Sequence, residues 1–225
     1  MTPRRPHLLS QLVPAAAERD SAAIAVVAPD DRLDYDGLAD RIGRFASALG
    51  SLDVVPGDRV AVFAPKSIDS FVAMHGALYA GAIAVPVDPR SPTPALQALT
   101  RELTPRVVVA APSTGDRWPD PSVPTVGASN EPGSPHLSWA DVGEFEPRGP
   151  VDRLGEDPAY IISTSGSTGR PKSIVHTHTS ALRYAELAAD CYDLDHEDRM
   201  ANVAPFHFDQ STFELYSAPL AGAAT

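Results

Sequence analysis

The chain has 225 residues, 43% of them hydrophobic, and a formal net charge of −11 at pH 7. A chain of this length and apolar content can bury a substantial core in one large or two small domains. The acidic balance argues against nucleic acid or an anionic membrane as the main partner. No apolar run reaches the ~18 residues that a membrane helix needs, and a single cysteine excludes an internal disulfide. These features together predict a cytoplasmic enzyme.

Strand and helix patterns alternate from the N-terminus onward. Two short extended segments, residues 22–27 and 32–35, surround the turn residues at 29–31 and predict a hairpin. The elements expected next are helix 36–49, strand 59–64, helix 67–79, strand 83–87, helix 93–103 and strand 107–110. This order predicts an α/β fold in which a mostly parallel sheet is covered by helices.

The middle of the chain changes composition. Residues 112–158 are rich in Pro, Gly, Ser and Asp, and we interpret them as a linker of loops with one short strand at 123–126. The elements expected after it are strand 159–163, strand 174–177 and helix 180–190. We therefore expect a first α/β subdomain over residues 1–158 and the start of a second one over residues 159–225.

The most informative segment is residues 163–173 (STSGSTGRPKS), which follow an apolar strand. Gly166 and Gly169 permit positive φ and a close backbone approach, and successive backbone N–H groups can form a concavity that binds anions. The hydroxyl groups add hydrogen-bond donors, and Lys172 adds a mobile positive charge that suits phosphate. This loop therefore predicts a polyphosphate-binding site.

Two other interpretations of the loop are weaker. A Walker A loop needs a glycine directly before Lys172, but Pro171 stands there, and proline lacks an N–H and fixes φ. A flexible Ser/Gly linker is the second alternative, but the position directly after a buried strand disfavours it. The chain has only two lysines, Lys66 and Lys172, among 18 basic residues. A lysine inside this loop therefore favours a specific role.

Residues 160–178 (YIISTSGSTGRPKSIVHTH) closely resemble the phosphate-binding signature of the adenylate-forming superfamily. That superfamily includes acyl-CoA synthetases, luciferases and the adenylation domains of nonribosomal peptide synthetases. Two positions depart from the usual pattern. Ser163 stands where an aromatic residue is common, and Ser173 stands where glycine is usual.

Two earlier segments resemble the first and second core motifs of the same superfamily. In residues 32–39, Asp34 or Asp36 can cap the helix that follows. Residues 78–89 combine a helix end, a Gly81 C-cap, a buried strand and a proline stop. We interpret both segments as packing elements, so they support the order of the motifs and not the chemistry.

Residues 205–214 (PFHFDQSTFE) resemble the motif that begins the acyl-substrate pocket. In the amino-acid-activating branch of the superfamily, an Asp at the position of Asp209 pairs with the α-ammonium group of the substrate. The resemblance implies three further substrate-binding residues: His207, Gln210 and Phe213. A partly buried carboxylate is unfavourable unless it is paired, which agrees with an ammonium partner. The alternative is that Asp209 caps the helix that begins near Ser211.

The resemblance implies carboxylate activation. The substrate carboxylate attacks the α-phosphate of Mg-ATP, pyrophosphate leaves, and the acyl-adenylate then passes its acyl group to the thiol of a carrier protein or of coenzyme A. Such in-line transfer depends on positioning and charge stabilisation. The residues implied to hold the β- and γ-phosphates are Thr164, Ser165, Gly166, Ser167, Thr168, Gly169 and Lys172. ATP and Mg²⁺ are the expected cofactors, and an amino acid is the expected substrate.

The chain covers less than half of the usual length of the superfamily. It ends before the adenine-contacting motif, the ribose-binding Asp, the hinge and the small C-terminal domain with its catalytic lysine. We therefore expect a truncated N-terminal part of the fold, working with a separately encoded C-terminal half. The alternatives are a fragment of an acyl-CoA or aryl-acid ligase, and a non-catalytic nucleotide-binding remnant.

No protein metal site is expected from the histidines. His176 and His178 are two residues apart on a predicted strand, so their side chains point to opposite faces. His207 lies far from both in the sequence, and a site made only of these three residues lacks close ligands.

Cys191 continues an apolar stripe along the helix predicted at 180–190. Tyr184 and Leu187 precede it at helical spacing. This pattern predicts a buried structural thiol and not a nucleophile.

Overall fold

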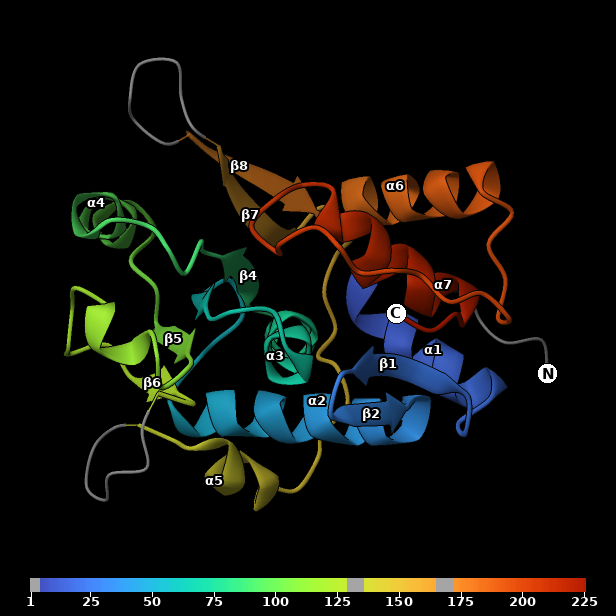
Figure 1. Cartoon of the computed structure of the whole chain (residues 1–225), viewed down its shortest axis with the longest axis horizontal. Helices are drawn as coiled ribbons and strands as arrows, with labels where there is room; N and C mark the ends of the chain where they lie inside the picture. The colour runs from blue at the N-terminus through green and yellow to red at the C-terminus, as the bar shows by residue number, and fades with distance from the viewer. Residues whose placement is uncertain (1–4, 129–135, 165–171) are drawn as a thin grey trace.

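The structure is a computed structural model that describes residues 5–128, 136–164 and 172–225. Within them, six strands form one sheet in the order β6-β5-β3-β4-β7-β8. Their bounds are β3 Arg59–Phe63, β4 Ile83–Pro86, β5 Val107–Ala110, β6 Thr125–Val126, β7 Pro158–Thr164 and β8 Lys172–Thr177. Neighbours from β6 to β7 run parallel, and β8 runs antiparallel to β7 (Figure 1). The predicted α/β fold with a mostly parallel sheet is confirmed.

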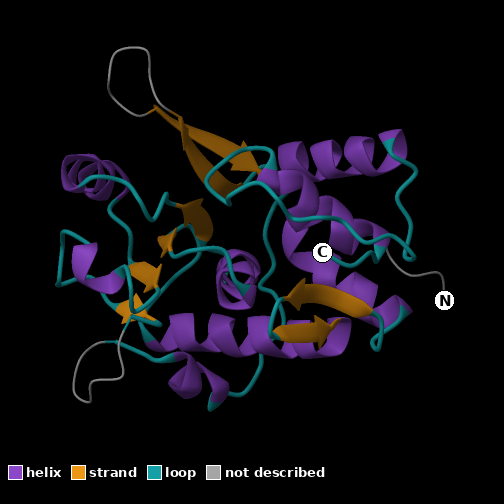
Figure 2. Cartoon of the chain, viewed as in Figure 1, coloured by secondary structure: helices purple, strands orange, loops and turns teal. Residues whose placement is uncertain are grey.

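Helices cover both faces of the sheet. The α-helices within the described residues are α1 Leu12–Arg19, α2 Tyr35–Ser51, α3 Ile68–Tyr79, α4 Thr93–Leu103, α5 Trp139–Gly143, α6 His178–Cys191 and α7 Ala218–Ala221. Side chains of β3 alternate between two cores, since Val60 and Val62 belong to one core and Ala61 and Phe63 to the other. The first core includes α2 and α3, and the second includes α4. Figure 2 shows strands of the sheet between α4 and the end-on helix α3.

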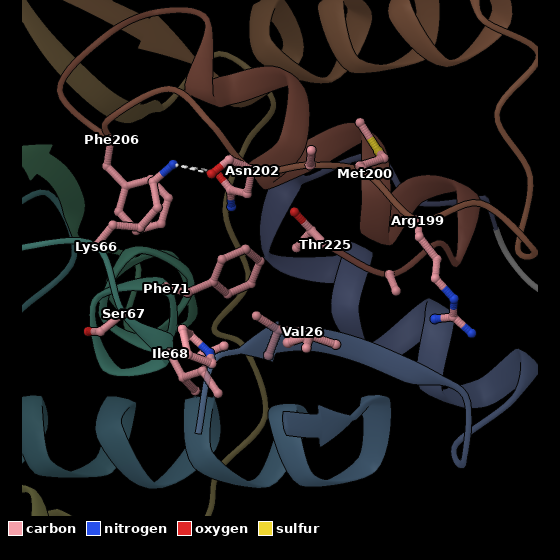
Figure 3. Close-up of a pocket in the computed structure, with 15 residues that line it drawn as sticks. Val26, Lys66, Ser67, Ile68, Phe71, Arg199, Met200, Asn202, Phe206 and Thr225 are labelled. Atoms are coloured by element: carbon pink, nitrogen blue, oxygen red, sulfur yellow. Dashed lines mark hydrogen bonds between the residues drawn. The ribbon is translucent and has the colours of Figure 1, made fainter. Parts of the chain in front are cut away.

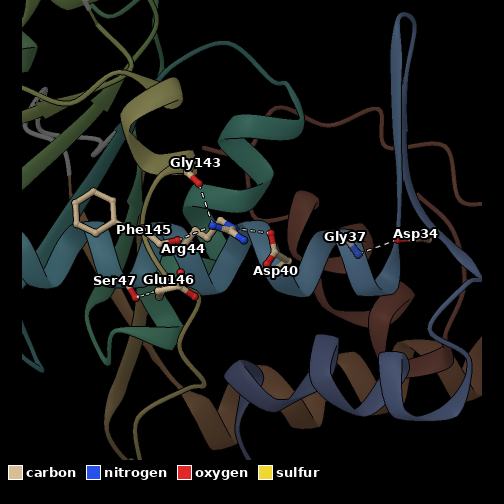
Figure 4. Close-up of polar contacts among 8 residues, drawn as sticks. All are labelled: Asp34, Gly37, Asp40, Arg44, Ser47, Gly143, Phe145 and Glu146. Atoms are coloured by element: carbon tan, nitrogen blue, oxygen red, sulfur yellow. Dashed lines mark hydrogen bonds and ion pairs between the residues drawn. The ribbon is translucent and has the colours of Figure 1, made fainter.

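A separate hairpin precedes α2, as predicted. Strands β1 (Ile24–Ala28) and β2 (Asp31–Asp34) pair antiparallel. Of the two candidate caps, the structure uses Asp34, whose carboxylate accepts the Gly37 N–H at 2.8 Å (Figure 4). This bond satisfies one of the unpaired donors at the start of α2.

Part of the segment predicted as a linker, from α5 to Glu146, is packed against α2. Arg44 donates to the carbonyl oxygens of Gly143 (2.9 Å) and Phe145 (2.7 Å), and Ser47 donates to that of Glu146 (2.7 Å) (Figure 4). The short helix α5 lies where the sequence predicts loop. Because the partners of this segment lie about a hundred residues away on α2, local composition could not indicate that it packs.

The prediction of a buried Cys191 is wrong, because this side chain is exposed. Tyr184 and Leu187 on the same face of α6 are also exposed, by 44% and 62%. The buried face of α6 carries smaller residues, among them Ala185 and Ala188. Periodicity identified an apolar stripe but not which face the rest of the chain covers.

Candidate functional site

The predicted phosphate loop is carried by the hairpin of β7 and β8. Thr164 ends β7 directly opposite Lys172, the first residue of β8, and its hydroxyl donates to the Lys172 carbonyl oxygen at 3.5 Å. Both side chains are exposed. The other predicted phosphate-binding residues, Ser165, Gly166, Ser167, Thr168 and Gly169, lie outside the described residues. The structure therefore presents the two ends of the loop at the tip of a hairpin.

The two unusual residues of the loop motif face each other. Ser163 on β7 and Ser173 on β8 are direct partners in the antiparallel register. Both hydroxyl oxygens are buried. Serine at both positions is thus a matched small pair across the hairpin and leaves the register intact.

The segment with the predicted substrate residues is a series of turns that leads into a helix. The Ser211 hydroxyl donates to the carbonyl oxygens of Phe206 (3.1 Å) and Phe208 (2.7 Å). The Thr212 hydroxyl donates to the Asp209 carbonyl oxygen at 2.6 Å. These local bonds of Ser and Thr hydroxyls fix the turn. It is followed by a π-helical turn, η3 (Phe213–Ser217), and by α7.

A cavity of about 470 Å³ joins the loop-bearing hairpin to this segment. One wall holds Thr164 and Ile162 at the end of β7, and another holds His207 and Asp209. The remaining residues at its wall are Pro86, Val87, Asp88, Ser91, Ala95, Leu96, Leu99, Ser163 and Phe208. The cavity lies at the carboxyl ends of the neighbouring parallel strands β4 and β7. In open α/β sheets, ligands bind at this edge.

Asp88 connects β4 to the substrate segment. One carboxylate oxygen lies 3.6 Å from Nε2 of His207, and the other accepts the Arg90 backbone N–H at 2.9 Å and Nε at 3.2 Å. Partial burial alone would raise the pKa of Asp88, but the bonds from Arg90 and the nearby His207 lower it below its ordinary value. Burial lowers the pKa of His207, and the charge of Asp88 opposes that shift.

The Asp88–His207 pair stands between two cavities. A smaller one of about 270 Å³ lies at the carboxyl ends of β3 and β4 and shares Asp88 and His207 with the larger one. Strand order reverses here, because the chain runs from β3 to β4 on one side and then to β5 on the other side of β3. Such a switch point is a common ligand site in α/β sheets.

The four predicted substrate residues do not share one cavity. His207 and Asp209 line the cavity next to β7, whereas Gln210 and Phe213 line another cavity of about 440 Å³. The other residues that line this cavity are two tyrosines, a buried carboxylate and two apolar residues: Tyr184, Tyr192, Glu214, Val203 and Ala204. The structure thus places the four residues in two pairs, one pair at each cavity.

Asp209 does not act as a helix cap through its side chain. Its Oδ1 accepts the N–H of the next residue, Gln210, at 2.9 Å, whereas the Thr212 N–H binds the Asp209 backbone carbonyl oxygen. An N-cap side chain would bind a backbone N–H two or three residues later. The expectation of a partly buried Asp209 is wrong, because its side chain is exposed, so burial gives no argument for an ammonium partner. The carboxylate lies near Tyr184 and His176, and its charge opposes the fall that burial causes in the pKa of His176.

Sequence reasoning missed Asp88 as a site residue. It treated residues 78–89 as packing, and most of them are buried. The usable signal was the position of an acidic residue directly after a buried strand, at the carboxyl edge of a parallel sheet.

Residues 5–128, 136–164 and 172–225 contain neither a cluster of metal ligands nor a membrane-spanning helix. No group of three or more His, Cys, Asp or Glu side chains there could hold a metal ion. His176 stacks on Tyr160 at 4.6 Å between centroids, whereas Nδ1 of the buried His178 accepts the Leu9 N–H at 3.3 Å. None of the helices in these ranges has both the length and the apolar composition that a membrane crossing requires.

Comparison with known proteins gives consistent matches over nearly the whole chain. The family described as AMP-binding enzyme matches residues 13–225. The L-proline--[L-prolyl-carrier protein] ligase of Pseudomonas fluorescens is 33% identical over 202 residues, which are 88% of this chain and 40% of the ligase. The chain therefore spans less than half the length of this curated relative.

Solved structures share the fold. The nonribosomal peptide synthetase FmoA3 in its AMPPNP-bound form is 27% identical with a TM-score of 0.80, over 98% of this chain and 23% of FmoA3. A putative long-chain-fatty-acid CoA ligase from Rhodopseudomonas palustris has a TM-score of 0.87 at 22% identity, over 96% of this chain and 56% of that chain. At that identity the second likeness concerns the fold alone.

Proposed function

Because the chain belongs to the AMP-binding enzyme family and has the fold of its N-terminal subdomain, we propose that it supplies the N-terminal half of an adenylate-forming ligase that activates an amino acid with Mg-ATP. The observation that carries this proposal is the cavity shared by Thr164, His207 and Asp209. It joins the flank of the phosphate loop to the residues expected to hold the acid.

The donor set at the hairpin tip suits the phosphates of ATP. Thr164 supplies a hydroxyl group and Lys172 an ammonium group, on opposite strands and both exposed. The expected role of Ser165, Gly166, Ser167, Thr168 and Gly169 is to add backbone and hydroxyl donors between them. ATP would supply the leaving group, with Mg²⁺ bound through its phosphates.

The acid would be held at the other end of the cavity. Asp209 is exposed and its carboxylate keeps acceptor capacity beyond the bond from Gln210, so it can pair with an α-ammonium group. His207 would pack beside the reacting carboxylate, and its pKa lowered by burial favours the neutral imidazole near neutral pH. Gln210 and Phe213 would contact the substrate side chain from the neighbouring cavity.

We infer the steps after adenylation from the same family membership. The acyl group would pass to the thiol of a carrier protein or of coenzyme A, and the C-terminal part of the adenylate-forming fold would complete the enzyme. The relative from Pseudomonas fluorescens is named for a carrier-protein substrate, which favours a carrier protein. The division at residue 158 and the cytoplasmic location remain predictions from the sequence.

Two measurements test the proposal. Calorimetric titration of the chain with Mg-ATP should give a binding signal. Pyrophosphate exchange should then appear with at least one amino acid when the chain is combined with the C-terminal half of a related ligase. Binding without exchange of any amino acid would support a nucleotide-binding remnant. Equal exchange with an acid that lacks an amino group would support an acyl-CoA or aryl-acid ligase.

A further inference from the structure

Lys66 lies in the turn between β3 and α3, next to the segment that leads to the predicted substrate residues. Its Nζ donates to the carbonyl oxygen of Asn202 at 2.8 Å and to the Asn202 side-chain oxygen at 2.7 Å (Figure 3). It also donates to the carbonyl oxygen of Ala204. These partners are more than 130 residues away in the sequence. One side chain thus ties the carboxyl end of β3 to the chain at 202–204.

The three bonds use all three donors of an ammonium group. Nζ also lies 5.1 Å from the ring centroid of Phe206, within the range of a cation–π interaction. Phe206 is buried and packs edge-on against Phe71 of α3 with a centroid distance of 6.3 Å. Partial burial lowers the pKa of Lys66, and the charge of Glu214 opposes that shift. All three donors of Lys66 are therefore engaged with the protein itself.

The contacts of Lys66 end where the substrate turn begins. The Pro205 carbonyl oxygen accepts the Phe208 N–H at 2.9 Å, and the Phe206 carbonyl oxygen accepts the Ser211 hydroxyl. The turn that carries His207 and Asp209 is thus held by Ser211 on its C-terminal side and by Lys66 on its N-terminal side. Lys66 does not line the cavity shared by Thr164 and Asp209, although it lines the smaller cavity beside it.

We propose that Lys66 is a positioning residue that fixes residues 202–208 so that His207 and Asp209 face the acid-binding cavity. The role of the cavity as the acid-binding site rests on the proposed function. The tether between Lys66 and residues 202–204 does not depend on that function. A lysine suits the task because three acceptors converge on one point charge, whereas the planar guanidinium of arginine spreads its donors. The chain otherwise prefers arginine, with only two lysines among 18 basic residues.

Hydrogen exchange tests the tether without any ligand. Lys66→Met keeps an unbranched side chain against Phe206 and removes the charge and the donors. We expect amide exchange over residues 208–212 to accelerate by about tenfold, with β3 unchanged. The matched control is Arg106→Met, which removes an exposed cation that pairs with Asp53 at 3.4 Å far from the turn. Unchanged exchange in Lys66→Met, or an equal change in the control, would overturn the proposal.

Two milder variants keep the test informative if Lys66→Met alters the fold. Asn202→Ala removes one of the three acceptors and should accelerate the same amides by a smaller factor. Lys66→Arg keeps the charge and should restore part of the protection. Faster exchange throughout the chain in all three variants would indicate general destabilisation and would contradict a local tether.

A functional split separates positioning from a general structural role. In the reconstituted enzyme, Lys66→Met should raise the KM for the amino acid by about tenfold while the affinity for Mg-ATP stays unchanged. Equal losses for both ligands would contradict the positioning role. If the reconstituted enzyme shows no pyrophosphate exchange with any acid, the proposed function fails. The hydrogen-exchange experiment tests the Lys66 tether independently of that outcome.

Discussion

Nε2 of His207 lies 3.6 Å from the carboxylate of Asp88, so the end of a central parallel strand contacts the turn that carries the predicted substrate residues. The two side chains form part of the wall of both cavities at the carboxyl edge of the sheet. Arg90 holds the Asp88 carboxylate from the other side through its backbone N–H and Nε. His207 therefore lies beside the residues that directly follow β4, although it belongs to a segment of turns.

The first prediction concerns the titration of His207. Burial lowers its pKa and Asp88 opposes the shift, so Asp88→Asn should lower the pKa further because the opposing charge is lost. A ¹H–¹³C NMR titration of the imidazole, assigned with a His207→Asn variant, measures this. A pKa in the variant equal to or above that of the unsubstituted chain would contradict the pairing.

A second prediction isolates the charge of Asp209. Asp209→Asn can keep the hydrogen bond from the Gln210 N–H, because the amide oxygen still accepts it. The substitution should weaken the affinity for an amino acid by about tenfold or more and leave Mg-ATP binding unchanged. An acid without an amino group serves as the control substrate. If both acids lose affinity equally, Asp209 does not pair with an ammonium group.

Lys172 is the subject of the third prediction. It is exposed at the start of β8, so Lys172→Ala should leave the thermal unfolding midpoint unchanged. Its affinity for Mg-ATP should fall by about tenfold, the usual scale for one charged contact to phosphate. Arg183→Ala, on the exposed side of α6, is the matched control and should bind Mg-ATP normally. Unchanged affinity in Lys172→Ala would remove its phosphate role.

The parts of the fold that local patterns determine were predicted well. The bounds of α4 and β5 agree with the sequence prediction residue for residue, because a helical apolar period and a short apolar run are local signals. The Asp88–His207 contact could not be predicted, because it joins residues brought together only by the order of strands. Cys191 was placed wrongly for the same reason, since its exposure depends on which face of α6 is covered.

A fourth prediction follows from His75, which is fully buried between Phe71 and Tyr216. Burial lowers its pKa to about 4, although the bond to the Leu215 carbonyl oxygen opposes the shift. The unfolded chain, with an ordinary pKa near ~6.5, therefore binds more protons than the folded one between these values. The contribution of His75 to the free energy of unfolding is therefore complete at pH values above its pKa in the unfolded chain. It is lost as the pH falls toward its pKa in the folded chain.

For His75 alone, the free energy of unfolding should fall by about 2 kcal/mol between about pH 7 and about pH 5. His75→Gln can keep a donor for the Leu215 carbonyl oxygen but does not titrate in this range. The free energy of unfolding of this variant should therefore fall by about 2 kcal/mol less over the same pH interval. Urea unfolding at several pH values measures both. Equal pH dependence in the two proteins would show that His75 titrates normally in the folded state.

The last prediction compares two glycines of α2 and tests whether residues 147–148 pack against that helix. A Cβ at Gly43 would lie 2.8 Å from the Arg148 carbonyl oxygen, which is backbone and cannot move freely. At Gly50 it would meet the end of the flexible Arg148 side chain at 3.4 Å. Alanine favours a helix over glycine by up to about 1 kcal/mol at both positions. Gly50→Ala should therefore stabilise the chain by a fraction of that amount.

Gly43→Ala should instead lower the free energy of unfolding, because overpacking costs about 1–3 kcal/mol and exceeds the helix gain. Urea unfolding of both variants measures the difference in sign. If Gly43→Ala is as stabilising as Gly50→Ala, residues 147–148 do not lie against α2 in solution. The segment would then be the free linker that its composition suggests.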